Sequence, residues 1–176
     1  MENKSGQIWI ETVIYTLIGL SLIGLVLAIL TPQIKEFKDR SAIEQSIDSL
    51  NVFDSKIEEV LDAPGNRRKV ELTLAKGEFI IDATENRTAY EIAESDSMYS
   101  EPGLPIQVGR IKVTTFELTK KYRVVLEINY PLYDITFEGK NSLEKFSAAK
   151  IPYKFFINNN GTNPTTGVLQ IDITEN

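Results

Sequence analysis

A long stretch without charge constrains this chain more than any other feature. Between Glu11 and Lys35 the sequence contains no Asp, Glu, Lys or Arg. A helix over residues 12–34 would be about 35 Å long, enough to cross the hydrocarbon layer of a bilayer. The run is longer than the apolar region of a secretory signal, and no small-x-small cleavage site follows it. We therefore expect a membrane-spanning helix near the N-terminus.

A short polar leader precedes this helix, with a small residue, Gly6, at its end and an acid, Glu11, five positions later. The arrangement resembles the type IV pilin family, and Gln7 after the glycine is closer to the archaeal branch. The resemblance implies that a prepilin peptidase cuts between Gly6 and Gln7. It also implies that Glu11 serves in assembly as the fifth residue of the mature chain. A carboxylate in an apolar helix needs a partner, and the α-amine freed on a neighbouring subunit is a suitable cation.

For function, the resemblance implies a structural subunit of an archaeal type IV pilus-like surface filament. The expected partners are the peptidase, other copies of the chain, an assembly platform with its ATPase, and membrane lipid before assembly. The subunit would be a single-pass membrane protein with an extracellular C-terminal domain, and then part of a filament. Adhesion, motility and DNA uptake all remain open, as does a major or minor place in the filament.

The alternative is a monomeric, single-pass membrane-anchored extracellular binding module, in which Glu11 is only an interfacial residue. The sequence gives conflicting signals on the orientation of the span. Lys35, Lys38 and Arg40 follow it, and such bases favour the cytoplasmic side of the membrane for this flank. Interleaved acids and the downstream glycosylation sequons favour an extracellular position for the same flank.

Beyond the span, the sequence predicts that the helix continues as an amphipathic stalk. Pro32 either kinks the helix or ends the span. Apolar residues then recur at steps of three and four, at Ile34, Phe37, Ile43, Ile47, Leu50, Phe53, Ile57 and Val60 or Leu61. Charged residues including Asp39 and Asp54 are expected on the solvent-exposed face of this helix. The segment 62–65, Asp-Ala-Pro-Gly, should end the helix.

After this helix the hydrophobic period changes to two, which indicates strands. We expect a hairpin of 70–74 with 79–81, a second of 111–118 with 122–130, and two last strands at 154–157 and 168–173. An exposed loop is expected over 89–105, one or two helical turns over 142–149, and a loop over 158–167.

The predicted fold class is therefore α+β, with a long N-terminal helix and an antiparallel β-rich head that is sandwich-like if the strand count holds. The expected divisions are the leader 1–6, the transmembrane and filament-core helix 7–34, the stalk helix 35–63 and the extracellular head 64–176.

Composition argues against several classes of function. Cys and His are both absent, which removes thiol catalysis, Cys-based zinc sites and Ser-His-Asp triads. The formal net charge of −6 makes nucleic acid an improbable partner. We expect no enzyme activity, no cofactor and no metal site, and the acids Glu94, Asp96 and Glu101 are interpreted as a solvated loop. The basic run 67–69 is interpreted as a solvated turn.

Glycosylation is predicted at Asn86 and Asn160, each of which begins an Asn-x-Thr sequon. Asn160 is the better candidate, because Asn160-Gly161-Thr162 is expected in a loop. A third sequon, at Asn3, would leave with the leader.

Overall fold

A computed structural model describes residues 4–164 and 166–176 of the chain, with side chains of the first helix described from Trp9 onward. The sequon residue Asn3 lies outside the described residues. The chain divides into two units, which end and begin at Lys38 and Asp39.

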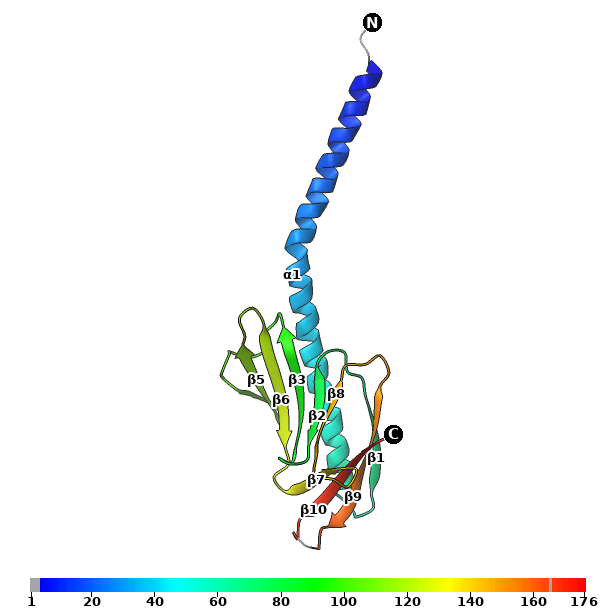
Figure 1. The fold of residues 1–176 in the computed structure, drawn as a ribbon, viewed down its shortest axis with the longest axis vertical. Helices are drawn as coiled ribbons and strands as arrows, with labels where there is room; N and C mark the ends of the chain where they lie inside the picture. The colour runs from blue at the N-terminus through cyan, green and yellow to red at the C-terminus, as the bar shows by residue number, and fades with distance from the viewer. Residues whose placement is uncertain (1–3, 165) are drawn as a thin grey trace. The chain divides into compact units, whose positions relative to one another are not determined.

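One helix, α1 (Lys4–Val60), precedes all the strands (Figure 1). Ten strands follow in the described chain: β1 (Arg67–Leu72), β2 (Glu78–Asp82), β3 (Arg87–Ser95), β4 (Ile106–Val108), β5 (Ile111–Glu117), β6 (Tyr122–Asn129), β7 (Tyr133–Phe137), β8 (Leu143–Ser147), β9 (Tyr153–Thr162) and β10 (Leu169–Glu175). The predicted α+β class, with a long N-terminal helix and a β-rich head, is confirmed.

The strands form two sheets, one of four strands in the order β1-β9-β10-β7 and one of six in the order β4-β5-β6-β3-β2-β8. All pairs are antiparallel except β10 with β7, which is parallel. The head is therefore antiparallel, as predicted, except at this one pair. A parallel pair requires a crossover connection, and the chain supplies one from β7 through β8 and β9 before β10.

The second half of α1 and both sheets share one hydrophobic core. Six apolar side chains of the predicted stripe are buried there: Ile43, Ile47, Leu50, Phe53, Ile57 and Val60. The Phe53 ring packs edge-on against Phe79 of the six-stranded sheet, at 5.0 Å between centroids, and against Phe155 of the four-stranded sheet, at 6.0 Å. Phe53 therefore contacts an aromatic ring of each sheet, within a core that the other five helix side chains also share.

The first two stripe residues do not belong to this core. Ile34 and Phe37 are 51% and 75% exposed and precede the second unit, which begins at Asp39. The helix that supports the head therefore runs from Asp39 to Val60, and the next residues, 61–65, are turns. Asn159 donates a hydrogen bond from Nδ2 to the Val60 carbonyl at 2.8 Å, which satisfies an acceptor at the helix end.

The pairing of β5 with β6 confirms the second predicted hairpin. Their register pairs Lys112 with Glu127, and Leu118 N–H closes the turn by donating to the Lys121 carbonyl at 2.8 Å. The last two predicted strands are also confirmed, as β9 and β10, and they pair with each other.

The first predicted hairpin is wrong. β1 pairs with β9 in one sheet, whereas β2 pairs with β3 and β8 in the other. The connection 73–77 crosses between the sheets, and the buried Leu74 belongs to the shared core. An alternating pattern predicts that two segments are strands but not which strands they pair with, because strand pairing depends on long-range packing.

Parts of three segments predicted as irregular or helical are strands. β3 occupies residues 89–95 of the expected loop 89–105 and lies between β6 and β2 in its sheet, whereas 96–105 contains no strand, as predicted. β8 replaces the helical turns expected over 142–149, and β9 continues to Thr162 into the expected loop 158–167. These strands are rich in Ala, Asn, Glu and Ser, which have weak strand propensity. Their sheet partners override that local preference.

Two acids predicted on the solvent-exposed face of the helix are buried instead. Asp39 is 7% exposed and Asp54 is 6% exposed. Each is paired with a base from the β-rich part of the chain, as described below, and the pairing compensates for the loss of hydration.

Candidate functional site

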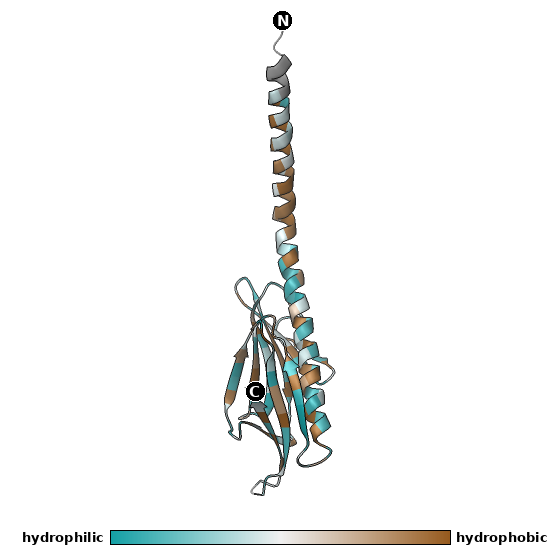
Figure 2. Ribbon diagram, turned by 90° about the vertical axis from the view of Figure 1, so that its right-hand side faces the viewer, coloured by the Kyte–Doolittle hydropathy of each residue, from teal (hydrophilic) through white to brown (hydrophobic). Residues whose placement is uncertain are grey.

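The first unit presents an apolar helical surface. Among its described side chains, from Trp9 to Lys38, all are exposed except Gly19, which is half-buried. The helix is long and apolar enough to cross a membrane. Figure 2 shows apolar colours along this part of α1 and alternating colours along the part that follows. An isolated surface of this kind has a large cost in water and requires lipid or protein to cover it.

Three hydroxyl groups within this apolar stretch form hydrogen bonds inside the helix. Thr16, Ser21 and Thr31 each donate a hydrogen bond to the carbonyl oxygen four residues earlier, at 2.8, 2.8 and 2.6 Å. Side chains bonded in this way do not expose an unpaired donor to hydrocarbon. These three hydroxyl residues are therefore compatible with immersion in a bilayer.

The predicted cleavage and assembly residues lie in the first turns of the same helix. Gly6 and Gln7 are within α1, and Glu11 is exposed on it. Cleavage after Gly6 and a role for Glu11 in assembly stay predictions. Pro32 lies inside α1, so the helix does not end there, and the expected kink also stays a prediction.

Asp39 links the helix to two loops, one before β2 and one after β3. Its Oδ1 accepts from Lys76 Nζ at 2.5 Å, and its Oδ2 accepts from the backbone N–H of Asp96 at 2.7 Å. Asp96 in turn pairs with Lys121 in the β5–β6 turn. This chain of contacts fixes the first residue of the second unit to two neighbouring connections.

A second buried acid, Asp54, faces β5 and the end of β6. Arg110 Nη1 lies 3.2 Å from Asp54 Oδ2 and 2.5 Å from Glu58 Oε1. Asp54 Oδ1 is buried and has no hydrogen-bond partner among the described residues. Burial raises the pKa of the Asp54 carboxyl, and the neighbouring Arg110 cation opposes that rise. Burial also raises the pKa of the nearby Tyr130 phenol, whose hydroxyl is 3.1 Å from Thr88 Oγ1.

The two sequon residues occupy different settings at the same end of the sheets. Asn86 has a positive φ of 50° in the β2–β3 turn, and its Oδ1 accepts from Ile135 N–H at 2.7 Å. Asn160 is exposed but lies in β9, so the expectation that it sits in a loop is wrong. Glycosylation at either residue stays a prediction.

Within the described part of the chain, no group of three or more His, Cys, Asp or Glu residues is placed to hold a metal ion. The three acids of the expected loop are not gathered: Asp96 is engaged with Lys121, and Glu94 lies in β3. The basic run 67–69 lies in β1 rather than in a turn, with Arg68 paired to Glu59 and Lys69 to Glu71.

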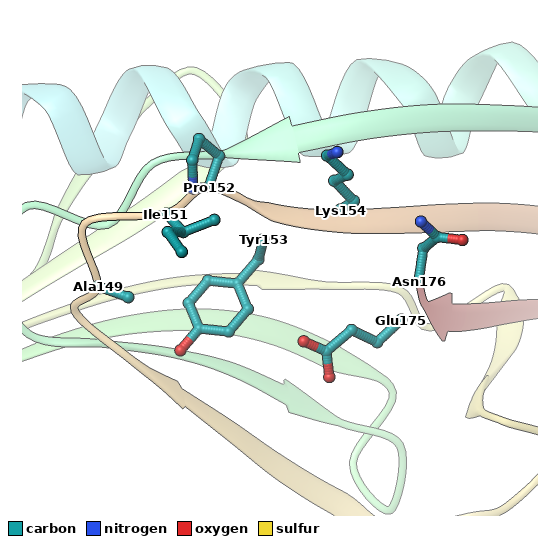
Figure 3. Close-up of a pocket in the computed structure, with 7 residues that line it drawn as sticks. All are labelled: Ala149, Ile151, Pro152, Tyr153, Lys154, Glu175 and Asn176. Atoms are coloured by element: carbon teal, nitrogen blue, oxygen red, sulfur yellow. The ribbon is translucent and has the colours of Figure 1, made fainter.

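Two open hollows flank the connection between β8 and β9. The larger has a volume of about 350 Å³ and the other about 340 Å³. Figure 3 shows Ile151, Tyr153 and Glu175 around the larger one. Sequence reasoning did not select this connection, although an isolated apolar residue, Ile151, between Lys150 and Pro152 was a visible signal.

Comparison with known proteins adds no relative to this picture: no family model, no curated protein and no solved structure matches the chain.

Proposed function

We propose that this chain is a structural subunit of a type IV pilus-like surface filament, held in the membrane by the first part of α1 before assembly. The observation that carries the proposal is the exposed, charge-free helical surface over residues 12–34, preceded by Gly6 and Glu11. Lipid covers this surface before assembly, and the same surface of other copies covers it in the filament. A prepilin peptidase, an assembly platform and its ATPase are the partners that this function requires.

Glu11 has a specific role in the proposal. Cleavage after Gly6 creates an α-amine at Gln7, and this cation on one subunit pairs with Glu11 of the next. In an apolar bundle each charge alone would be costly, so the pair favours one axial register of neighbouring helices. The β-rich unit then lies on the outside of the filament, where Asn86 and Asn160 are candidate glycan acceptors.

Intact-mass measurement of the native surface protein tests the processing step. After enzymatic removal of any glycans, the expected mass is that of a chain beginning at Gln7. Replacement of Gly6 by Leu should leave uncut precursor in the membrane, since the peptidase needs a small side chain there. Surface material that retains Met1 to Gly6 would remove the main support for the proposal.

A second test concerns Glu11. The Glu11→Val variant should insert in the membrane and be cleaved, yet form few filaments in negative-stain images. Glu36→Val is the matched control, because it also removes an exposed helical carboxylate but lies beyond the apolar run, and it should assemble normally. Normal filament numbers with Glu11→Val would favour the alternative, a membrane-anchored binding module that does not assemble.

A further inference from the structure

One end of the second unit is defined by Asp39, where the helix enters. Asp39 contacts Lys76 and Asp96, which belong to connections at that end. The strand register places further connections beside them. Glu78 pairs with Ser147, and Ser95 pairs with Tyr122. We call this set the entry end: the connections 73–77, 96–98, 118–121 and 148–152 (Figure 1).

Two connections of the entry end expose an apolar side chain next to lysine. Ile151 is 78% exposed and follows Lys150, and Leu118 is 43% exposed and precedes Lys120 and Lys121. Large apolar side chains beside bases are the combination that inserts at a membrane interface, where the chain tip enters the acyl boundary and the base contacts headgroups.

A hollow lies beside Ile151. The hollow of about 350 Å³ is lined by Ile151 and Tyr153 and, on its other side, by Glu175 (Figure 3). The Tyr153 hydroxyl donates to the Ser147 carbonyl at 2.9 Å, which holds the ring in place beside the connection. The hollow is therefore a surface feature with a fixed wall.

The charges of the entry end favour an anionic surface at two points. Lys120 and Lys150 form no ion pair with any residue of the described chain, whereas Lys76 and Lys121 are compensated by Asp39 and Asp96. Acids such as Glu117 and Glu175 are also near this end, so the attraction is local to the two lysine-bearing tips.

Chain length limits how far this end can lie from the charge-free run. The charge-free run ends at Ile34, and only four residues, 35–38, separate it from Asp39. Because these residues are helical, they advance by about 6 Å along the helix axis, comparable to the polar layer on one side of a bilayer. If the run spans a membrane, as the proposed function requires, the entry end is tethered within reach of lipid headgroups.

We infer that the entry end is a lipid-contacting surface, in which Ile151 and Leu118 insert at the interface and Lys150 and Lys120 contact anionic headgroups. This contact holds the subunit against the membrane before assembly and is released when the helix leaves the bilayer. The inference depends on the membrane span of the proposed function but not on cleavage or filament formation. The candidate glycan acceptors, Asn86 and Asn160, are at the opposite end of the strands, away from this surface.

The absence of Cys allows a direct test on the full chain, because one introduced cysteine is unique. A nitroxide label at Ile151→Cys is measured in bilayers of phosphatidylglycerol and phosphatidylcholine by its accessibility to oxygen and to a water-soluble nickel reagent. Leu132→Cys is the matched control, since Leu132 is 73% exposed at the opposite end. Leu22→Cys, within the charge-free run, reports insertion of the span.

The label at residue 151 should be several-fold more accessible to oxygen relative to nickel than the label at residue 132. Pure phosphatidylcholine, or the changes Lys150→Glu and Lys120→Glu together, should reduce that difference. Equal values at 151 and 132, with the label at 22 buried in the bilayer, would overturn the inference and leave the membrane span intact. A water-exposed label at residue 22 would overturn both. Protection of residue 151 only in assembled filaments would identify this end as a contact between subunits and would also overturn the lipid assignment.

Discussion

The buried pair of Asp54 and Arg110 yields a quantitative prediction for Arg110→Ala. Truncation leaves the Asp54 carboxylate, 6% exposed and already short of one hydrogen bond, without its cation. Removing one partner of a fully buried pair costs about 3–5 kcal/mol. The Arg110 side chain is 43% exposed, so solvent screens its side of the pair, and we expect a loss of about 2 kcal/mol in the free energy of unfolding at neutral pH.

The loss should depend on pH in a defined direction. Burial raises the pKa of the Asp54 carboxyl above its ordinary value of 3.8, so the folded state holds this proton more tightly than the unfolded state. The contribution of Asp54 is therefore most favourable below 3.8 and declines as pH rises through the folded pKa. Without Arg110 that pKa rises further. The difference between variant and wild type should thus shrink as pH falls and Asp54 becomes neutral.

Urea unfolding of the full chain in mild detergent, followed by the β-sheet signal in circular dichroism, measures these differences. Arg123→Ala is the matched control, because Arg123 is also 43% exposed but its partner Glu91 is more exposed and 3.7 Å away. We expect the control to lose about 0–1 kcal/mol. Adding Asp54→Asn to Arg110→Ala should restore most of the stability, since no buried charge remains. Equal, pH-independent losses for Arg110→Ala and Arg123→Ala would refute this reasoning.

Two further predictions concern the second unit. A fragment of residues 39–176 should be soluble, folded and monomeric by sedimentation and circular dichroism. A fragment of 44–176 should be less stable because it lacks Asp39 with its two hydrogen bonds and the buried Ala42 and Ile43; equal melting temperatures would contradict this. Gly77→Ala should destabilise by about 2 kcal/mol or more, because its φ is 85° and a Cβ would lie 2.4 Å from a backbone carbonyl of β3. Gly139→Ala, at a φ of 72° with open space around it, should lose only about 1 kcal/mol in the same urea titration, and equal losses would show that the carbonyl contact has no effect.

Sequence patterns predicted the structure correctly where the interacting residues are close together in the chain. The Lys120-Lys121 turn joins strands that are neighbours along the chain, and the β5–β6 hairpin was predicted from their alternation alone. Helix termination before Pro64 and Gly65 was also local, because proline and glycine act on the backbone near them.

Patterns failed where the partner is distant. β1 and β2 looked like a hairpin, but each finds its neighbours elsewhere, so the sheet assignment required the whole head. β3 was assigned to an irregular segment because Pro102, Gly103 and Pro105 follow it, although it lies between two strands of its sheet. The entry end was invisible for the same reason, since Leu118 and Ile151 are far apart in sequence and are brought to one end by strand register.

The sequence by itself determined the apolar helix, its leader and the α+β class, because the absence of charge over 12–34 and the change of hydrophobic period are properties of consecutive residues. Tertiary structure alone decided which helical acids are buried. In sequence, Asp39 and Asp54 cannot be distinguished from the solvated acids of the same helix. Their partners, Lys76 and Arg110, come from the β-rich part of the chain and are brought close only by the fold. A charge can leave water only when an opposite charge or donor meets it, and that meeting depends on the fold rather than on the residues on either side.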